Sequence, residues 1–193
     1  SAATYTLTVR NTLNGCTATD AVTISQNTTP PVANAGADKT LTCSVTSLQI
    51  GTPAVAGNMY FWLPDSGLSS AGVAQPNTTV PATYTLTVTN LSNGCTATDV
   101  VIISQDTTPP ITNAGADKTL TCTNTSLQIG TAVVAGNTYL WSPATGLDFA
   151  SIAQPTTSTP DTYTLTVTNT SNGCKATDEV IVSQDTTPPV ANA

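Results

Sequence analysis

The sequence predicts an all-β protein of tandem β-sandwich repeats, each 79 residues long, and three observations support this. The segment SQNTTPP at 25–31 returns as SQDTTPP at 104–110 and 183–189, always 79 residues further on. The segment TYTLTV, at 4–9, 83–88 and 162–167, alternates polar and apolar residues as a half-buried strand does. No stretch shows helical periodicity. A fixed period of this length is the signature of a repeat architecture.

The repeats align without a gap, and 56 of the 79 positions in 30–108 are identical in 109–187. The sequence therefore predicts two full sandwich repeats, at 30–108 and 109–187. It also predicts the C-terminal part of a truncated repeat at 1–29 and the start of another at 188–193. We expect the chain to be a window from a longer array. The paired prolines between repeats favour extended backbone, so we expect a stiff spacer and a rod.

The strands of each repeat follow from alternation and turn chemistry. In TYTLTVTN (83–90) the residues Tyr84, Leu86 and Val88 share one face, and threonines line the other. The turn LSNG (91–94) predicts a hairpin with 95–105. Upstream, KTLTC (39–43) and SLQIGT (47–52) are predicted to form a second short pair. A third strand carries the tryptophan, and we count about seven short strands in each repeat.

Two aromatic positions favour an immunoglobulin-like version of the sandwich. The single tryptophan of each repeat, Trp62 or Trp141, falls where strand C is expected. The tyrosine that opens TYTLTV falls where a tyrosine corner begins strand F, at Tyr5, Tyr84 and Tyr163. In such a sheet the first and last strands run parallel.

The composition argues against several classes of function. The net charge is −7 with only four basic residues, which argues against nucleic acid or an anionic membrane as a partner. No run of 18 apolar residues is present, so we expect no membrane insertion. The chain has no histidine, no phosphate-binding glycine loop and no motif that pairs carboxylates for acid–base work, so we do not expect an enzyme.

The pattern NAGADKTLTC…SLQIG…YxW…GL…AQPTT…TYTLTVTNxSNGCxATD resembles the PKD-like and immunoglobulin-like repeats of giant Bacteroidetes cell-surface adhesins. Among these it is most similar to the gliding-motility adhesins of flavobacteria, which the type IX secretion system exports. The resemblance covers the whole chain. Its motifs are specific for this style of repeat but not for one function, because similar modules also separate the domains of secreted hydrolases.

The resemblance implies a structural and adhesive repeat segment of a large extracellular filament, attached to the outer membrane at the cell surface. It implies a role in surface attachment and gliding motility. The expected partners are neighbouring repeats of the same chain and a surface polysaccharide or abiotic surface, with secretion and motility machinery elsewhere in the protein. Two alternatives remain open: a passive spacer in a secreted polysaccharide-degrading enzyme, and a carbohydrate-binding module.

The five cysteines fall into two classes. Cys16, Cys95 and Cys174 follow an Asn-Gly turn, whereas Cys43 and Cys122 end TLTC. Each full repeat holds one of each class, so the simplest pairing is Cys43–Cys95 and Cys122–Cys174, with Cys16 unpaired by truncation. The parallel first and last strands would hold these partners apart, so bridges between repeats, such as Cys43 with Cys174, and free thiols both remain open.

Two further kinds of site are candidates. Repeated carboxylates could converge near a joint between repeats and bind Ca²⁺, the one cofactor considered, although no calcium-loop motif is present. The weak candidates are Asp99, Asp106, Asp117, Asp178 and Asp185. The segments Asp-Thr-Thr at 106–108 and 185–187 resemble the Bacteroidetes O-glycosylation sequon. This resemblance marks Thr107 and Thr186 as possible glycosylation sites. The alternative, that these segments are plain polar linkers, stays open.

Overall fold

The computed structural model describes residues 2–192, so the outermost residues of the predicted segments 1–29 and 188–193 lie outside it. All regular structure in this range is β-strand. The strands in chain order are β1 (Ala3–Arg10), β2 (Thr17–Ile24), β3 (Lys39–Thr42), β4 (Leu48–Gln49), β5 (Asn58–Leu63), β6 (Asn77–Thr78), β7 (Ala82–Asn90), β8 (Thr96–Asp106), β9 (Lys118–Thr121), β10 (Leu127–Gln128), β11 (Asn137–Ser142), β12 (Thr156–Thr157), β13 (Asp161–Asn169) and β14 (Lys175–Asp185).

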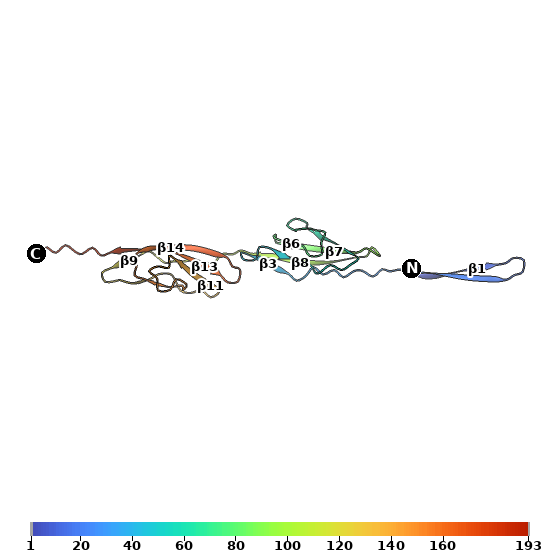
Figure 1. Ribbon diagram of the computed structural model, residues 1–193, viewed down its shortest axis with the longest axis horizontal. Coiled ribbons are helices and arrows are strands. Elements are labelled where there is room, and N and C mark those ends of the chain that lie inside the picture. Colours follow the sequence, from blue (N-terminus) through green and yellow to red (C-terminus); the bar gives the residue numbers. More distant parts are fainter. Residues whose placement is uncertain (1, 193) are drawn as a thin grey trace. The chain divides into compact units, whose positions relative to one another are not determined.

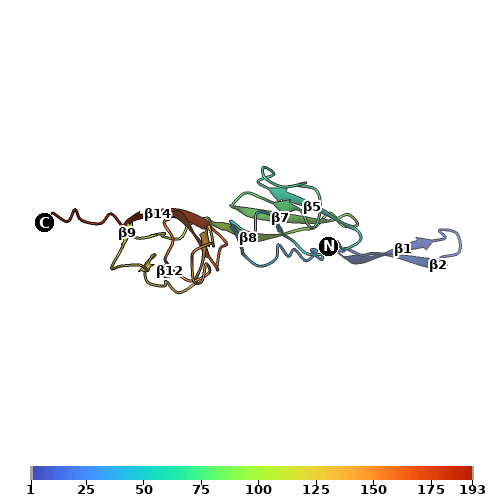
Figure 2. The ribbon, with the colours of Figure 1, turned by 60° about the vertical axis from the view of Figure 1, so that its left-hand side comes forward.

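The two repeats have the same sheet topology, which confirms the predicted all-β fold with two similar sandwich repeats. One repeat has a four-stranded sheet of order β3-β8-β7-β5 and a small sheet β4-β6. The other repeat has the order β9-β14-β13-β11 with the small sheet β10-β12. Figures 1 and 2 show the strands of this repeat, among them β9 and β14, as one group of ribbons. Six strands of each repeat are found in the described part of the chain, against the seven or so predicted, because the backbone of 30–38 and 109–117 pairs into no ladder.

The predicted hairpins are confirmed, and the core follows from their alternation. β13 pairs antiparallel with β14, and Tyr163 lies opposite Val180. One face of β13 joins Trp141 of β11 in a hydrophobic core whose members are almost fully buried. Trp62 of β5 and Tyr84 of β7 are equally buried at the equivalent positions of the other repeat. The tryptophan of each repeat therefore lies on the strand predicted for it.

The tyrosine corner is present in the second repeat. Tyr163 is fully buried, and its hydroxyl donates a hydrogen bond to the carbonyl of Thr159 at 3.1 Å. The Thr157 hydroxyl lies 2.8 Å from the Tyr163 hydroxyl. These bonds satisfy the polar end of a tyrosine whose ring is in the core, which burial of a tyrosine normally requires.

The predicted pairing of 39–43 with 47–52 is wrong. β3 pairs in parallel with the end of β8, with Lys39 opposite Ile103, and β9 pairs with β14 in the same way. The following strands, β4 and β10, belong to the small sheets. A sandwich needs apolar residues on both inner faces. Leu120 of β9 and Ile129, which directly follows β10, are both members of one core. The parallel arrangement of first and last strands is as predicted.

The chain forms two compact units. The first comprises Ser1–Ala37, Gln49–Asn77 and Thr83–Val101, and the second comprises Asp38–Leu48, Thr78–Ala82 and Ile102–Ala193. The second unit thus contains the turn after β3 as well as the whole of the repeat that begins at 109. The repeat boundaries drawn from the sequence stay a prediction. The described residues include no helix of the length and apolarity that crossing a bilayer requires.

Candidate functional site

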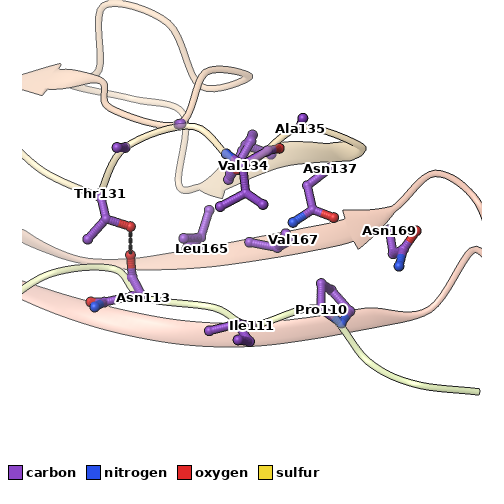
Figure 3. A pocket seen from close by; sticks show the side chains of 13 residues that line it. Pro110, Ile111, Asn113, Thr131, Val134, Ala135, Asn137, Leu165, Val167 and Asn169 are labelled. Carbon is purple, nitrogen blue, oxygen red and sulfur yellow. Dashed lines mark hydrogen bonds between the residues drawn. The ribbon is translucent and has the colours of Figure 1, made fainter.

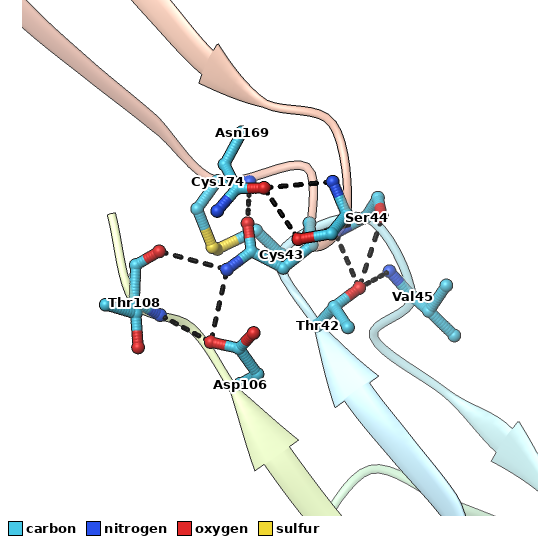
Figure 4. Close-up of a disulfide and its surroundings, with 10 residues drawn as sticks. Thr42, Cys43, Ser44, Val45, Asp106, Thr108, Asn169 and Cys174 are labelled. Atoms are coloured by element: carbon cyan, nitrogen blue, oxygen red, sulfur yellow. Dashed lines mark hydrogen bonds between the residues drawn. A yellow bond between two sulfur atoms is a disulfide. The ribbon is translucent and has the colours of Figure 1, made fainter. Parts of the chain in front are cut away.

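The most elaborate polar site of the second unit lies where three segments meet. These are the turn after β3, the end of β8 with its Asp-Thr-Thr segment, and the Asn-Gly-Cys turn between β13 and β14. A disulfide joins Cys43 of the first segment to Cys174 of the last, with a Cα–Cα distance of 5.0 Å (Figure 4). The two cysteines are 131 residues apart and belong to different repeats. We call this site the joint.

The disulfide corrects the simplest pairing made from the sequence. Cys43 pairs with Cys174, not with Cys95, while Cys95, Cys122 and Cys16 are free thiols. The reason is strand direction. β3 and β8 are parallel with Thr42 opposite Asp106, so Cys43 follows the far end of β8 while Cys95 precedes its beginning. Eleven residues of strand separate them, roughly 36 Å at about 3.3 Å per residue, whereas a disulfide spans less than about 7 Å.

An asparagine completes the joint. The side chain of Asn172 is 1% exposed, and its amide nitrogen donates to Asp106 Oδ1 at 3.1 Å and to the carbonyl of Thr108 at 3.0 Å. Its amide oxygen accepts the backbone N–H of Cys174 at 2.9 Å. All three strong hydrogen-bonding groups of this side chain are therefore used. We call this set of bonds the latch.

Asp106 is the charged member of the latch. The backbone N–H of Thr108 and the side-chain amide of Asn172 both donate to this carboxylate and hold its pKa below the ordinary value. Donors favour the ionised form, because they stabilise its negative charge. The latch is thus strongest while Asp106 is ionised.

The same latch recurs one period earlier, within the first unit. Asn93 Nδ2 donates to Asn27 Oδ1 at 3.2 Å and to the carbonyl of Thr29 at 2.9 Å. Asn27 takes the place that Asp106 has in the other copy, and the amide oxygen accepts as the carboxylate does. The latch therefore forms here without a disulfide, since Cys95 is a free thiol.

Close approach at the joint depends on a glycine. Gly173 has a φ of +71°, and a Cβ at this position would lie 2.6 Å from the Cβ of Ser44. The backbone of Ser44 donates to the carbonyl of Asn172 at 3.2 Å across the same contact. A side chain at 173 would be strained by its backbone and would also push the two turns apart.

The carboxylates predicted as calcium ligands accept hydrogen bonds from backbone N–H groups. Asp99 accepts from Ala35 at 2.8 Å, Asp178 from Ala114 at 2.7 Å, and Asp117 from Ile181 at 2.9 Å. Asp185 accepts from Thr187, which lowers its pKa.

The predicted convergence of Asp99 with Asp106 is wrong. They lie seven residue steps apart along the single strand β8, about 23 Å at roughly 3.3 Å per residue. In the described part of the chain, no group of three or more Asp, Glu, Cys or His side chains could hold a metal ion.

The two candidate glycosylation residues lie in the segments between repeats. Thr107 and Thr186 are both exposed. Thr107 sits between Asp106 and Thr108, which are both members of the latch, so a sugar on it would stand at the edge of the joint. Modification of either threonine stays a prediction.

A cleft of about 500 Å³ opens on the second repeat (Figure 3). It is lined mostly by apolar groups, with Leu165 and Val167 of β13 at its floor and Ile111 at its edge. Tyr139 is the one aromatic residue that lines it, and its hydroxyl accepts the backbone N–H of Val134 at 2.7 Å. The cleft therefore offers a sugar ring little of the exposed aromatic surface that carbohydrate-binding modules use.

Sequence reasoning missed Asn172, Asn93, Gly173 and Ser44 as members of the joint. The Asn-Gly pair was interpreted only as turn chemistry. The available signal was that NGC, and not merely a turn-forming sequence, recurs unchanged at 14–16, 93–95 and 172–174.

Comparison with known proteins gives structural likeness only. No family model and no curated protein matches the sequence. Among solved structures, extracellular domains 3–5 of Drosophila OTK align with a TM-score of 0.40 at 13% identity, over 96% of this chain and 72% of that one. An I-band fragment of titin aligns with a TM-score of 0.42 at 11% identity, over 79% of this chain and 63% of that one.

Cadherin domains 1–4 of protocadherin gamma B7 give a TM-score of 0.41 at 10% identity, over 96% of this chain and 58% of that one. Likenesses of this strength carry no argument by themselves. Strand order, the parallel first and last strands, the core tryptophan and the tyrosine corner define the class. The chain consists of tandem immunoglobulin-like β-sandwich repeats.

Proposed function

We propose that the chain is a structural and adhesive segment of an extracellular surface filament, which serves surface attachment and gliding motility. The observation that carries this proposal is the joint: two nearly identical repeats are tied by a buried asparagine and by a disulfide between Cys43 and Cys174. A joint of this kind suits a protein that transmits tension from one repeat to the next. Disulfides persist in oxidising compartments, which supports an extracellular location.

Repetition also suits adhesion. Many weak contacts add to strong attachment when they are linked, because each bound repeat raises the effective concentration of the next. The proposed partners are a surface polysaccharide or an abiotic surface, with anchoring to the outer membrane and motility machinery elsewhere in the protein. The loop at 146–152, which carries the exposed Phe149, differs from 67–73 at four of its seven positions and is the proposed contact region.

The test uses an antibody against residues 30–187, coupled to small beads and placed on living cells of the source organism. Beads carried along the surface would support a mobile gliding adhesin. If beads bind and stay in place, the proposed role in gliding is wrong and the chain belongs to a static adhesin or stalk. If beads fail to bind and the antigen is found in the medium, the spacer of a secreted polysaccharide-degrading enzyme becomes the better explanation. A glycan array with 30–187 tests the carbohydrate-binding module separately.

A further inference from the structure

The three Asn-Gly-Cys turns have the same local geometry, whether or not their cysteine is bonded. In each, the asparagine Oδ1 accepts the backbone N–H of the cysteine, at 3.0 Å for Cys16 and 2.9 Å for Cys95 and Cys174. The glycine N–H bonds a carbonyl at 2.8 Å in all three. The free cysteines are therefore presented by their turns as the bonded one is.

What differs is how much of the joint surrounds each turn. Asn14 is exposed, Asn93 is half-buried against the linker residues 27–29, and Asn172 is buried against both a linker and the turn after β3. The cysteines follow the same order, because Cys16 is exposed, Cys95 is intermediate and Cys174 is buried. The three turns thus differ in how many of the contacts of the joint they make with other segments: none of those described for Asn14, the linker contacts for Asn93, and all of them for Asn172.

The glycines show independently which of these turns has a neighbouring turn packed against it. A Cβ at Gly173 would collide with Ser44, whereas a Cβ at Gly94 would meet nothing within 4 Å. Both residues have nearly the same positive φ. The space that the turn of Ser44 fills at Gly173 is therefore open at Gly94, in a turn of otherwise identical shape.

The complementary half is also present in an unbonded copy. The Thr42 N–H bonds the carbonyl of Val45 at 2.9 Å, and the Thr121 N–H bonds that of Asn124 at 3.0 Å. Both threonine hydroxyls accept a backbone N–H three residues on, at 3.0 Å. Cys122, which follows Thr121, is exposed and free. Cys122 therefore lies in a turn with the same hydrogen bonds as the turn that contains Cys43.

We propose that Cys95 and Cys122 each form a disulfide of this same kind, not with each other but with a cysteine of a further repeat of this sequence. Where a repeat precedes, its TLTC cysteine bonds Cys95; where a repeat follows, its NGC cysteine bonds Cys122. Cys16 belongs to the same class as Cys95. Consecutive repeats of an array are then covalently tied at every joint. The proposal concerns how repeats are linked and does not depend on an adhesive function.

Each bridge forms by oxidation of two thiols. The two sulfurs bond, and the two protons and two electrons pass to an external disulfide, which leaves as two thiols. The latch does not require the disulfide, because its copy at Asn93 closes while Cys95 is a free thiol. In this proposal the latch holds the two cysteine turns together before the bond forms. Held next to each other in this way, the thiols meet at a high effective concentration.

The experiment adds one repeat to the whole chain. Residues 188–193 have the same sequence as 30–35, so 36–108 appended after Ala193 completes a third full repeat with native junctions. The protein is oxidised with glutathione disulfide, alkylated, and digested without reduction for mass spectrometry. We expect Cys122 linked to the added copy of Cys95, beside the Cys43–Cys174 bridge. Free thiols then stay at three while the total number of cysteines rises from five to seven.

Two matched variants serve as controls. Serine in place of the added copy of Cys95 should leave Cys122 open to alkylation and Cys43–Cys174 intact. Alanine in place of the added copy of Gly94 should have the same effect, because the new Cβ would meet the turn of Thr123. The proposal is wrong if Cys122 of the unsubstituted protein stays alkylatable while Cys43–Cys174 forms, or if Cys122 bonds any other cysteine.

Discussion

Gly173 and Gly94 occupy equivalent turns, yet only Gly173 faces a neighbour. Alanine at either position has the strain of a positive φ, about 1 kcal/mol, but only at 173 does the new Cβ meet Ser44. We therefore expect Gly173→Ala to keep the joint open, with Cys43 and Cys174 alkylatable under mild oxidation. Gly94→Ala should leave the bridge intact. Counting thiols by mass gives five free for the first variant and three for the second; three in both would contradict the role given to Gly173.

Asp106 makes the joint sensitive to acid. Its pKa is lowered in the folded protein, so the stabilisation that it contributes is fully present above the ordinary aspartate pKa of about 3.9. That stabilisation is lost as the pH falls through the lower, folded value. We expect the bridge Cys43–Cys174 to become more accessible to a phosphine reductant below about pH 4, by several-fold in rate.

Asp106→Asn is the matched control for this titration. Asn27 already fills the equivalent place and keeps the latch geometry, so the amide variant should retain the joint and lose its pH dependence. The ratio of reduction rates for the native protein and the variant removes the pH dependence of the phosphine itself. A ratio that stays constant from pH 6 to pH 2 would show that Asp106 does not control access to the bridge.

At the scale of elements, TYTLTV offers an internal comparison, because it occurs in the hairpin β1–β2 and in the full sandwich. In β13 its apolar side chains, Tyr163, Leu165 and Val167, are buried. In β1, Tyr5 and Leu7 are 59% and 65% exposed. Both strands pair in antiparallel hairpins of the same type. The difference in side-chain burial therefore comes from packing in the sandwich core and not from strand pairing.

Hydrogen exchange should separate these two copies of one sequence. An isolated two-stranded hairpin is marginally stable in water, so its amides open at little cost. We expect amides of 162–167 to be protected at least ~100-fold more than those of 4–9, measured by NMR or mass spectrometry. The identical sequences give nearly equal intrinsic rates, which makes the ratio a direct readout. Equal protection would mean that the hairpin is stabilised by something other than the contacts described.

The elements also show how far sequence reasoning reaches. Alternation around Tyr84 and Tyr163, with one tryptophan in each repeat, was enough to predict the sandwich and its hairpins, because these signals are local. The presence of one cysteine of each class in each repeat favoured a bridge within the repeat and left Cys43–Cys174 as an alternative. The observed pairing depends on strand direction, since parallel pairing of β3 and β8 places Cys43 far from Cys95. The expectation of parallel first and last strands already held this information, but proximity in sequence favoured the partner within the repeat.

The latch was missed for a related reason. Asparagine and glycine have strong turn preferences, so their recurrence before cysteine was explained without any further contact. The second role of Asn172 lies in bonds to Asp106 and Thr108, which are 66 and 64 residues away. No local pattern reports a contact over that separation. An identical NGC at each period was the only trace of it.

For the whole molecule, the bridge changes which part of the chain can carry load. A pull on the two ends passes through Cys43 and Cys174, so the 131-residue step between them cannot lengthen while the bridge is closed. With at most about 3.6 Å for each extended residue, the reduced chain of 193 residues reaches roughly 690 Å. The oxidised chain, which can extend only the remaining residues, reaches roughly 220 Å.

Single-molecule force spectroscopy on the chain held at both ends measures this difference. We expect an increase of about 470 Å in the final contour length on reduction, and the same long contour for Cys43→Ser and Cys174→Ser without reductant. Cys95→Ser is the matched control and should keep the short, oxidised contour, because Cys95 is a free thiol. A native chain that extends fully under non-reducing conditions would show that the bridge does not form or does not carry the load. In that case tension between the repeats would rest on the latch and the backbone of 107–110 alone.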